Sequence, residues 1–133
     1  MTPRSKAMDF LARREYGFEE LCLRLSKCFE SSTDIREAVT ILKTEGLQSD
    51  ERFAEALSQR RVNQGYGPNY IRRELSMKKI ASHIIEDAVA KHDWQTSILD
   101  VVAKNAHKTT QQLQKYLQYK GYDFEMINRV TRS

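Results

Sequence analysis

The densest group of charged side chains in this sequence lies between residues 60 and 79. This segment contains six basic side chains, Arg60, Arg61, Arg72, Arg73, Lys78 and Lys79, and one acidic side chain, Glu74. Guanidinium and ammonium groups bind phosphates and carboxylates, so the segment predicts contact with nucleic acid or with an acidic protein surface. The alternative interpretation is an ordinary solvated helix surface.

Between these basic groups lies the stretch "GYGPNYIRREL", from Gly65 to Leu75. Glycine-rich phosphate-binding loops have the pattern G-x-G-x-x-G after a strand, or G-x-x-x-x-G-K-[ST], and this stretch has neither. The residues instead predict a joint between two helices, because Gly65 can end one helix while Gly67 and Pro68 begin the next. Tyr66 is expected either to pack against this corner or to contact a partner.

No group of residues in the sequence is typical of catalysis or of metal binding. His83, His92 and His107 are scattered over different predicted helices, and no serine or cysteine has a recognisable nucleophile setting. Cys22 and Cys28 lie roughly 240° apart around one predicted helix, where a disulfide cannot close. We therefore expect two free thiols packed in the core, with no metal site, no cofactor and no enzymatic activity.

The composition is that of an ordinary globular protein with a mild positive charge. The 133 residues include 22 basic and 18 acidic side chains, which give a net charge of +4 and a pI near 9.1. Nucleic-acid binding would therefore need a local basic surface. No segment has the roughly 18 apolar residues that a membrane span requires, and Arg13 and Arg14 come too early for a signal peptide. A cytoplasmic location is expected.

Apolar residues recur with the period of a helix along nearly the whole chain, and the pattern predicts nine short helices. The expected helix stops are Gly46, Gly65 and Gly121, and the expected N-caps are Ser49, Asp93, Asp123 and Thr109, the last forming a capping box with Gln112. The apolar faces predict a core that includes Leu21, Cys22, Leu25, Cys28, Phe29, Ile35, Val39, Leu42, Phe53, Ala56, Leu57, Ile71, Leu75, Ile84, Ile85, Ala88, Val89, Trp94, Ile98, Val102, Leu113, Leu117, Ile127 and Val130.

The predicted helices fall into three similar groups. Leu25, Leu75 and Leu117 occupy matching places in "LCLRLSKCF", "IRRELSMKKI" and "LQKYLQYKGY", at spacings of 50 and 42 residues. A three-helix unit repeated three times, over residues 1–46, 47–92 and 93–133, explains this period. We predict an all-α protein with three tandem three-helix repeats, forming one elongated, curved array that suits extended partners.

Three segments make the sequence resemble the RecX family of bacterial modulators of the RecA recombinase. They are "ARRE" before the second helix, "DERFA" at the start of the central unit, and "GYGPNYIRREL" at its joint. The resemblance extends from about Met8 to Val130. It implies a non-enzymatic inhibitor that binds the RecA filament on single-stranded DNA. Such an inhibitor lowers ATP hydrolysis, strand exchange and filament growth.

On this resemblance, the partner-binding residues are expected in or near the matching motifs. They are Arg13 and Arg14 in "ARRE", Arg60, Arg61, Tyr66, Arg72 and Arg73 in or beside the central motif, and Lys78 and Lys79 just after it. An intramolecular role across a unit junction is an equal alternative for Arg13 and Arg14. The chain departs from the family at Asn69, where a basic residue is frequent, and at Cys28 and Lys79, where a glycine is expected.

Two functions of other classes stay open beside the regulator of RecA. A DNA-binding module that uses the basic face directly would bind bare DNA tightly and with a steep salt dependence. An adaptor that binds short helical peptides in a groove would be indifferent to both DNA and RecA. For the regulator we expect a monomer whose partner is the RecA filament, with no membrane partner and with a weak direct contact to DNA left open.

Overall fold

The computed structural model describes residues 1–132, which form nine α-helices and no strand. The helices are α1 (Pro3–Arg13), α2 (Phe18–Leu25), α3 (Ser32–Thr44), α4 (Asp50–Asn63), α5 (Pro68–Met77), α6 (Ser82–Val89), α7 (Trp94–Lys104), α8 (Thr110–Lys120) and α9 (Phe124–Thr131). The predicted all-α class and the predicted number of helices are confirmed over this range.

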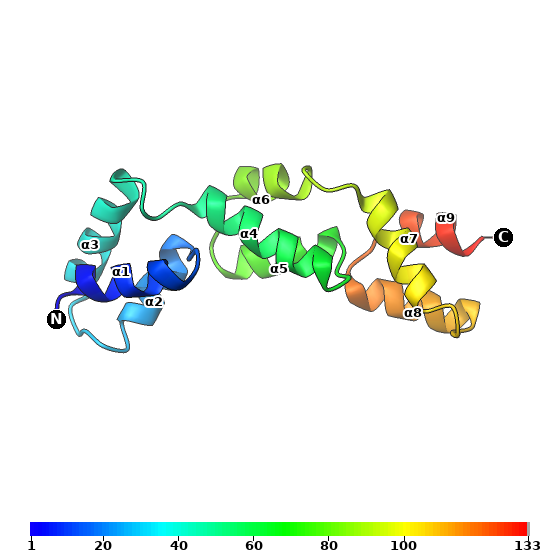
Figure 1. Ribbon diagram of the computed structural model, residues 1–133, viewed down its shortest axis with the longest axis horizontal. Helices are drawn as coiled ribbons and strands as arrows, with labels where there is room; N and C mark the ends of the chain where they lie inside the picture. Colours follow the sequence, from blue (N-terminus) through cyan, green and yellow to red (C-terminus); the bar gives the residue numbers. More distant parts are fainter. Residues whose placement is uncertain (133) are drawn as a thin grey trace.

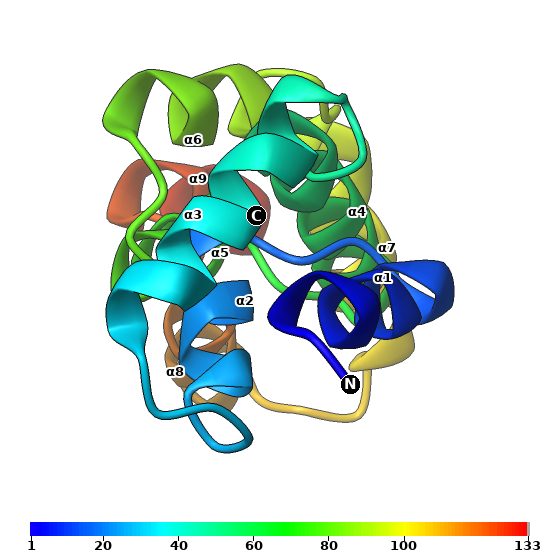
Figure 2. The same cartoon turned by 90° about the vertical axis from the view of Figure 1, so that its left-hand side faces the viewer.

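The helices form three units that follow one another along a single long axis, with the two termini at opposite ends (Figure 1). In each unit the third helix packs against both of the others, α3 on α1 and α2, α6 on α4 and α5, and α9 on α7 and α8. The end-on view shows the units lying behind one another (Figure 2). The predicted array of three-helix repeats is confirmed.

Each unit has a hydrophobic core of its own. The first is built around Leu21, Leu25, Ile35, Val39 and Leu42, the second around Phe53, Ile71, Leu75, Ile85 and Val89, and the third around Ile98, Val101, Leu117, Tyr122 and Ile127. Trp94 packs against both the second and the third core. Stability in such an array comes from each unit and from its contact with the next unit. The unit boundaries near residues 46 and 92 stay a prediction.

The predicted start and stop signals of the helices are confirmed. Gly46, Gly65 and Gly121 have φ angles of +79°, +89° and +98°, the left-handed conformation in which glycine ends a helix without a side-chain clash. The predicted N-caps each accept a hydrogen bond from a backbone N–H three residues on, at Ser49, Asp93, Thr109 and Asp123. These signals act within a few residues, which is why the sequence alone reveals them.

The prediction for the end of α2 is wrong. This helix ends at Leu25, where the N–H groups of both Cys28 and Phe29 donate to the Leu25 carbonyl and close a tight turn. Cys28 is therefore exposed, while Cys22 is buried and burial raises the pKa of its thiol. Elsewhere in the predicted core, Ala56 is exposed. Six more of the predicted residues are only partly buried against the three cores: Phe29, Ile84, Trp94, Val102, Leu113 and Val130.

No helix within residues 1–132 is long and apolar enough to cross a membrane. In the same described part of the chain, no three His, Cys, Asp or Glu side chains lie close enough together to hold a metal ion.

Candidate functional site

The joint predicted at "GYGP" is confirmed, and it also holds the second unit to the third. The N–H of Gly67 donates to the carbonyl of Lys120 at 2.7 Å, and the N–H of Asn69 donates to the carbonyl of Gly121 at 2.9 Å. A Cβ atom on Gly67 would lie 2.7 Å from the Gly121 carbonyl oxygen. Glycine is therefore required at this position, because the two backbones approach too closely for a side chain.

Tyr66 packs at this corner, as one of its two predicted roles requires. Its ring stacks on Tyr70 with the ring centroids 4.0 Å apart, and the Lys120 ammonium lies 3.6 Å from the Tyr66 centroid. Lys120 is only 8% exposed and donates to the Gln64 carbonyl at 3.0 Å. Burial lowers the pKa of this ammonium, while the ring face and the carbonyl stabilise its charged form.

The junction between the first and second units has the same plan. Tyr16 and Gly17 lie 50 residues before Tyr66 and Gly67, and Gly17 and Gly67 are the N-caps of α2 and α5. A Cβ on Gly17 would lie 3.2 Å from side chains of the second core. The Phe18 N–H donates across the junction to the Asp50 carboxylate at 2.8 Å.

A partly buried ion-pair cluster closes this first junction. Arg14 donates to both carboxylate oxygens of Glu20, at 3.2 and 3.1 Å, and its guanidinium lies 3.6 Å from the Tyr16 centroid. Lys78 reaches Glu20 from the second unit at 2.9 Å. Burial alone would raise the pKa of Glu20, but these hydrogen bonds hold it below its ordinary value. Arg14 thus makes the contacts that its intramolecular alternative expects, and its contact with a partner stays a prediction.

Two more of the predicted site residues form ion pairs inside the second unit. Arg61 on α4 donates to both oxygens of Glu74 on α5, at 2.7 and 2.8 Å, and each side chain is 20% exposed. Arg72 joins α5 to α6 by pairing with Glu86 at 3.0 Å. These contacts hold neighbouring helices in place, and they reduce the positive charge that the segment presents to a partner.

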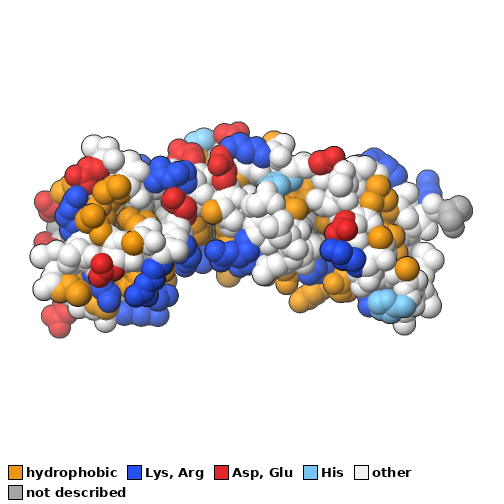
Figure 3. Space-filling view, in the orientation of Figure 1, with side chains coloured by type: hydrophobic (Ala, Val, Ile, Leu, Met, Phe, Trp, Pro, Cys, Tyr) orange, Lys and Arg blue, Asp and Glu red, His pale blue; other side chains and the backbone are white. Residues whose placement is uncertain are grey.

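The other four predicted side chains are exposed: Arg13, Arg60, Arg73 and Lys79. None of them joins an ion pair within residues 1–132. The space-filling view shows blue and red side chains interspersed over one face rather than gathered in one patch (Figure 3). Lys79 differs from the others in its backbone, whose φ of +64° is left-handed.

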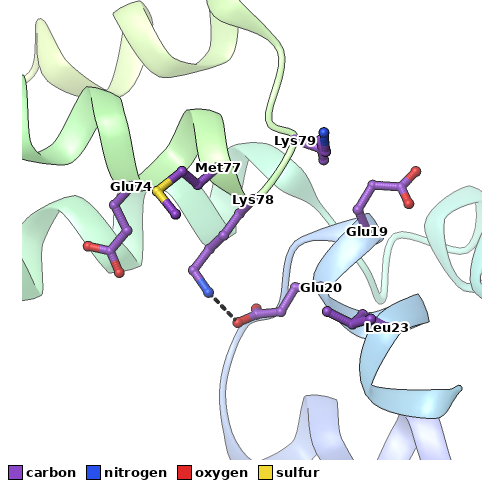
Figure 4. A pocket seen from close by; sticks show the side chains of 7 residues that line it. All are labelled: Glu19, Glu20, Leu23, Glu74, Met77, Lys78 and Lys79. Atoms are coloured by element: carbon purple, nitrogen blue, oxygen red, sulfur yellow. Dashed lines mark hydrogen bonds and ion pairs between the residues drawn. The ribbon is translucent and has the colours of Figure 1, made fainter. Parts of the chain in front are cut away.

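A groove of about 570 Å³ lies between α2 of the first unit and α5 of the second. Leu23 and Met77 stand on its two sides, 67% and 77% exposed, with the Lys78–Glu20 ion pair between them (Figure 4). Lys79 and Glu19 lie at one end of the same hollow. The groove thus combines exposed apolar side chains with charged groups that come from two units.

Sequence reasoning missed this groove because its walls lie on different units, far apart in the chain. A weak signal was present, since Leu23 and Met77 fall outside the buried stripe of their own helices. Sequence reasoning also missed Gln48, which is 1% exposed and donates to the Tyr16 carbonyl at 3.1 Å. Both features depend on how one unit meets the next.

Known proteins that are similar to this chain in sequence share one family name, RecX. The family model described as "RecX, second three-helix domain" matches residues 49–89 of this chain. Regulatory protein RecX of Legionella pneumophila (strain Corby) is 34% identical over 133 aligned residues, which cover 93% of this chain and 89% of that protein. Its counterpart from Ectopseudomonas mendocina (strain ymp) is 34% identical over 139 residues, covering 97% and 92%.

A solved structure shares the fold. The crystal structure of RecX from Lactobacillus salivarius superposes with a TM-score of 0.79 at 20% identity, covering 96% of this chain and 91% of that one. At this level of identity the likeness shows the fold alone, including the succession of three-helix units.

Proposed function

This chain belongs to the RecX family of regulatory proteins, and from that membership we propose that it regulates the RecA filament on single-stranded DNA. The observation that carries the proposal is the 34% identity to a RecX protein over 93% of the chain. In this role the protein lowers the ATPase activity of RecA, slows strand exchange and limits filament growth in the cytoplasm.

The elongated array supports a mechanism that needs no catalytic group. A chain of three units, with one junction held by backbone hydrogen bonds and the other by side-chain hydrogen bonds and an ion pair, can lie along a filament and contact successive protomers (Figure 1). If it binds one conformation of the filament better than another, it shifts the population toward that conformation. The ATPase rate of RecA then changes because its protomers are held in a less active state. We propose that one monomer acts in this way.

We divide the nine candidate residues by what they contact inside the chain. Direct contact with the filament is assigned to the four exposed side chains, Arg13, Arg60, Arg73 and Lys79. A positioning role is assigned to Arg14, Arg61, Tyr66, Arg72 and Lys78, which hold helices or units together. Loss of a positioning residue would alter the geometry of the array as well as its affinity for RecA.

Binding to bare DNA is the second candidate function. The four exposed basic side chains favour it, since cations without a carboxylate partner are available to phosphates. Acidic side chains interspersed with basic ones oppose it, because they repel the phosphate backbone (Figure 3). DNA contact is therefore proposed as an addition to RecA binding and not as the main activity.

The experiment that tests the proposal measures RecA ATP hydrolysis on single-stranded DNA while this protein is added, with its binding to the same DNA measured alone. We expect inhibition at protein concentrations well below that of RecA, together with weak and salt-sensitive binding to bare DNA. Inhibition that only follows coating of the DNA would instead support the second candidate. Absence of any inhibition would reject the regulator.

A further inference from the structure

The two apolar side chains that face the groove between α2 and α5 take no part in the ion pairs that hold the units together. Its walls include Leu23 and Met77, two of the large apolar side chains that remain exposed on this protein. Single exposed apolar residues are common on protein surfaces. Two that face one hollow from different units, with charged groups around them, are typical of an interaction site.

The charges around the hollow are not balanced. Its three carboxylates each form an ion pair with a guanidinium, in the pairs Glu19–Arg36, Glu20–Arg14 and Glu74–Arg61. Two ammonium groups of the second unit, Lys78 and Lys79, also line the hollow, and Lys78 shares Glu20 with Arg14. The lining itself thus carries three carboxylates and two ammonium groups. The three guanidinium groups outside it neutralise the carboxylates, so the ammonium of Lys79 is left to attract a negatively charged occupant.

Lys79 is placed there at a cost in backbone strain. Lys79 and Gly121 both follow the end of the middle helix of their units, and both have left-handed φ angles, +64° and +98°. Glycine adopts this conformation without penalty, whereas lysine does so only with a clash between its Cβ atom and the backbone. The second unit thus carries an ammonium group at a position where glycine would be less strained. Strain of this kind is most often found at functional sites.

We infer that the α2–α5 groove docks an acidic segment of the partner protein, which inserts one large apolar side chain between Leu23 and Met77 and pairs its carboxylates with Lys79. The inference rests on the proposed function, because RecA is the partner whose segment would occupy the groove. A hollow of about 570 Å³ has room for a leucine or phenylalanine side chain with its neighbours.

A protein segment suits this groove better than a DNA strand. Bases stack on aromatic rings, but the exposed walls here are the aliphatic side chains of Leu23 and Met77. Of the two ammonium groups in the lining, only that of Lys79 lacks a carboxylate partner within residues 1–132, which is too little positive charge to hold a continuous row of phosphates. An acidic peptide places its charges only at the ends of the hollow, where Lys79 lies (Figure 4).

Three variants test the groove: Met77→Ser, Leu23→Ser and Lys79→Gly. The control is Leu99→Ser, which removes a half-exposed leucine from α7 and leaves the groove intact. We expect the concentration for half-inhibition of the RecA ATPase to rise by at least about tenfold in the three groove variants and by less than about twofold in the control.

For Lys79→Gly we also expect a higher melting temperature, since the strain is relieved. A merely structural role of Lys79 could not raise stability while weakening inhibition.

A second measurement works without RecA. Fluorescence anisotropy would follow the binding of a labelled synthetic peptide that has one leucine flanked by aspartates. We expect binding to the wild-type chain, weaker binding by at least about tenfold in the groove variants, and equal losses when the peptide carries Leu→Ser or Asp→Asn. Two controls complete the set: binding of a labelled oligo-dT strand, and sedimentation of the chain alone. Neither should respond to Met77→Ser or Leu23→Ser, which remove no charge.

Each outcome separates the groove from the proposed function. Normal inhibition and peptide binding by all three variants would reject the groove and leave the RecA regulator standing. A wild-type chain that does not inhibit RecA would reject the regulator, and the peptide alone would then decide whether the groove binds acidic segments. Loss of oligo-dT binding in Met77→Ser and Leu23→Ser would mean that the groove is a DNA-binding site. A changed sedimentation coefficient of these variants would mean that the groove is a contact between copies of the chain. Either result overturns the inference.

Discussion

The N–H of Gly67 and the carbonyl of Lys120 are joined by a 2.7 Å hydrogen bond between the second and third units. Lys120 uses its backbone for this bond and its ammonium for the ring of Tyr66, so one residue of the third unit contacts the same loop twice. The "GYGP" sequence thus forms the surface of the second unit against which the third unit packs. The shape of the array depends on this contact and on the packing of Gly17 against the side chains of Phe53 and Ile80 at the first junction.

Gly67→Ala should destabilise the protein by about 1–3 kcal/mol, because its Cβ atom would lie 2.7 Å from a backbone oxygen that cannot move aside. Gly17→Ala is the matched control, since its added atom would meet only the ends of the Phe53 and Ile80 side chains at 3.2 Å. Urea unfolding of both variants tests the difference. Equal losses would show that the approach at Gly67 is no closer in solution than that at Gly17.

Lys120→Met should cost about 1–2 kcal/mol of unfolding free energy, although methionine keeps most of the apolar stem. The loss has two sources: the ammonium no longer contacts the Tyr66 ring, and the Gln64 carbonyl no longer accepts its hydrogen bond. Lys115→Met, at an exposed position on the same helix, should leave stability unchanged. A Lys120→Met protein as stable as wild type would mean that the cation contributes nothing to the junction.

Tyr122→Phe should change the response of stability to alkaline pH. The Tyr122 hydroxyl is buried without a hydrogen-bond partner in residues 1–132, and burial together with the charge of Asp100 raises its pKa to about 12. Because the folded state holds this proton more tightly, the stabilisation is complete below the ordinary value of 10.0 and is lost as pH rises toward 12.

Urea unfolding at pH 8 and pH 11 measures this effect. The wild-type chain should lose stability over this range by on the order of 1 kcal/mol more than Tyr122→Phe does. At pH 8 the variant should be as stable as wild type or slightly more so, since an unpaired buried hydroxyl is removed. Tyr119→Phe, at an exposed position, serves as the control. Parallel pH curves for Tyr122→Phe and wild type would contradict the assignment.

Arg61→Gln and Arg60→Gln should differ although the residues are neighbours. Arg61 makes a two-pronged pair with Glu74 between α4 and α5, so its loss should cost about 1–3 kcal/mol of stability. Arg60 is exposed, so Arg60→Gln should melt normally and weaken only the inhibition of RecA. Thermal melting and the RecA ATPase assay are measured for both variants. A lowered melting temperature of Arg60→Gln would refute the division into contact and positioning residues.

Arg73→Glu should weaken inhibition by at least about tenfold while the melting temperature stays near that of wild type. The guanidinium of Arg73 lies on the exposed side of α5, 6.0 Å from the Tyr70 ring, and forms no ion pair within the described chain. Arg72→Glu is a poorer probe, because it would place a carboxylate beside Glu86 and disturb α6. Full inhibition by folded Arg73→Glu would exclude this side of α5 from the contact.

The helices could be predicted because their signals are local. Gly46, Gly65 and Gly121 stop helices through a backbone conformation, and Asp93 starts one through a bond to an N–H three residues away. The error at α2 arose where a tight turn competed with the helical period. The apolar period continues to Phe29, but the backbone turns after Leu25, and periodicity cannot reveal a turn that closes on a single carbonyl.

The candidate site could be predicted only in part, since charge in a sequence does not reveal its partner in space. Arg61 and Arg73 look alike in "RRVNQGYGPNYIRREL", yet one is held by Glu74 and the other is exposed. The pairing of Lys78 with Glu20 joins residues 58 positions apart. Such contacts depend on the angle between units. This angle is set by the junction contacts at Gly17 and Gly67, and the period of a helix does not reveal it.

The third unit lacks the glycine N-cap that begins the middle helix of the first two units. Gly17 and Gly67 are the N-caps of α2 and α5, but the N-cap of α8 is Thr109, whose side chain bonds to Gln112. Thr109 thus carries a Cβ atom at the place where Gly67 has none, and at Gly67 such an atom would lie 2.7 Å from the Gly121 carbonyl oxygen of the following unit. The close backbone contact is therefore specific to the junction of the second and third units, and a second molecule could not continue the row of units by repeating that contact at Thr109.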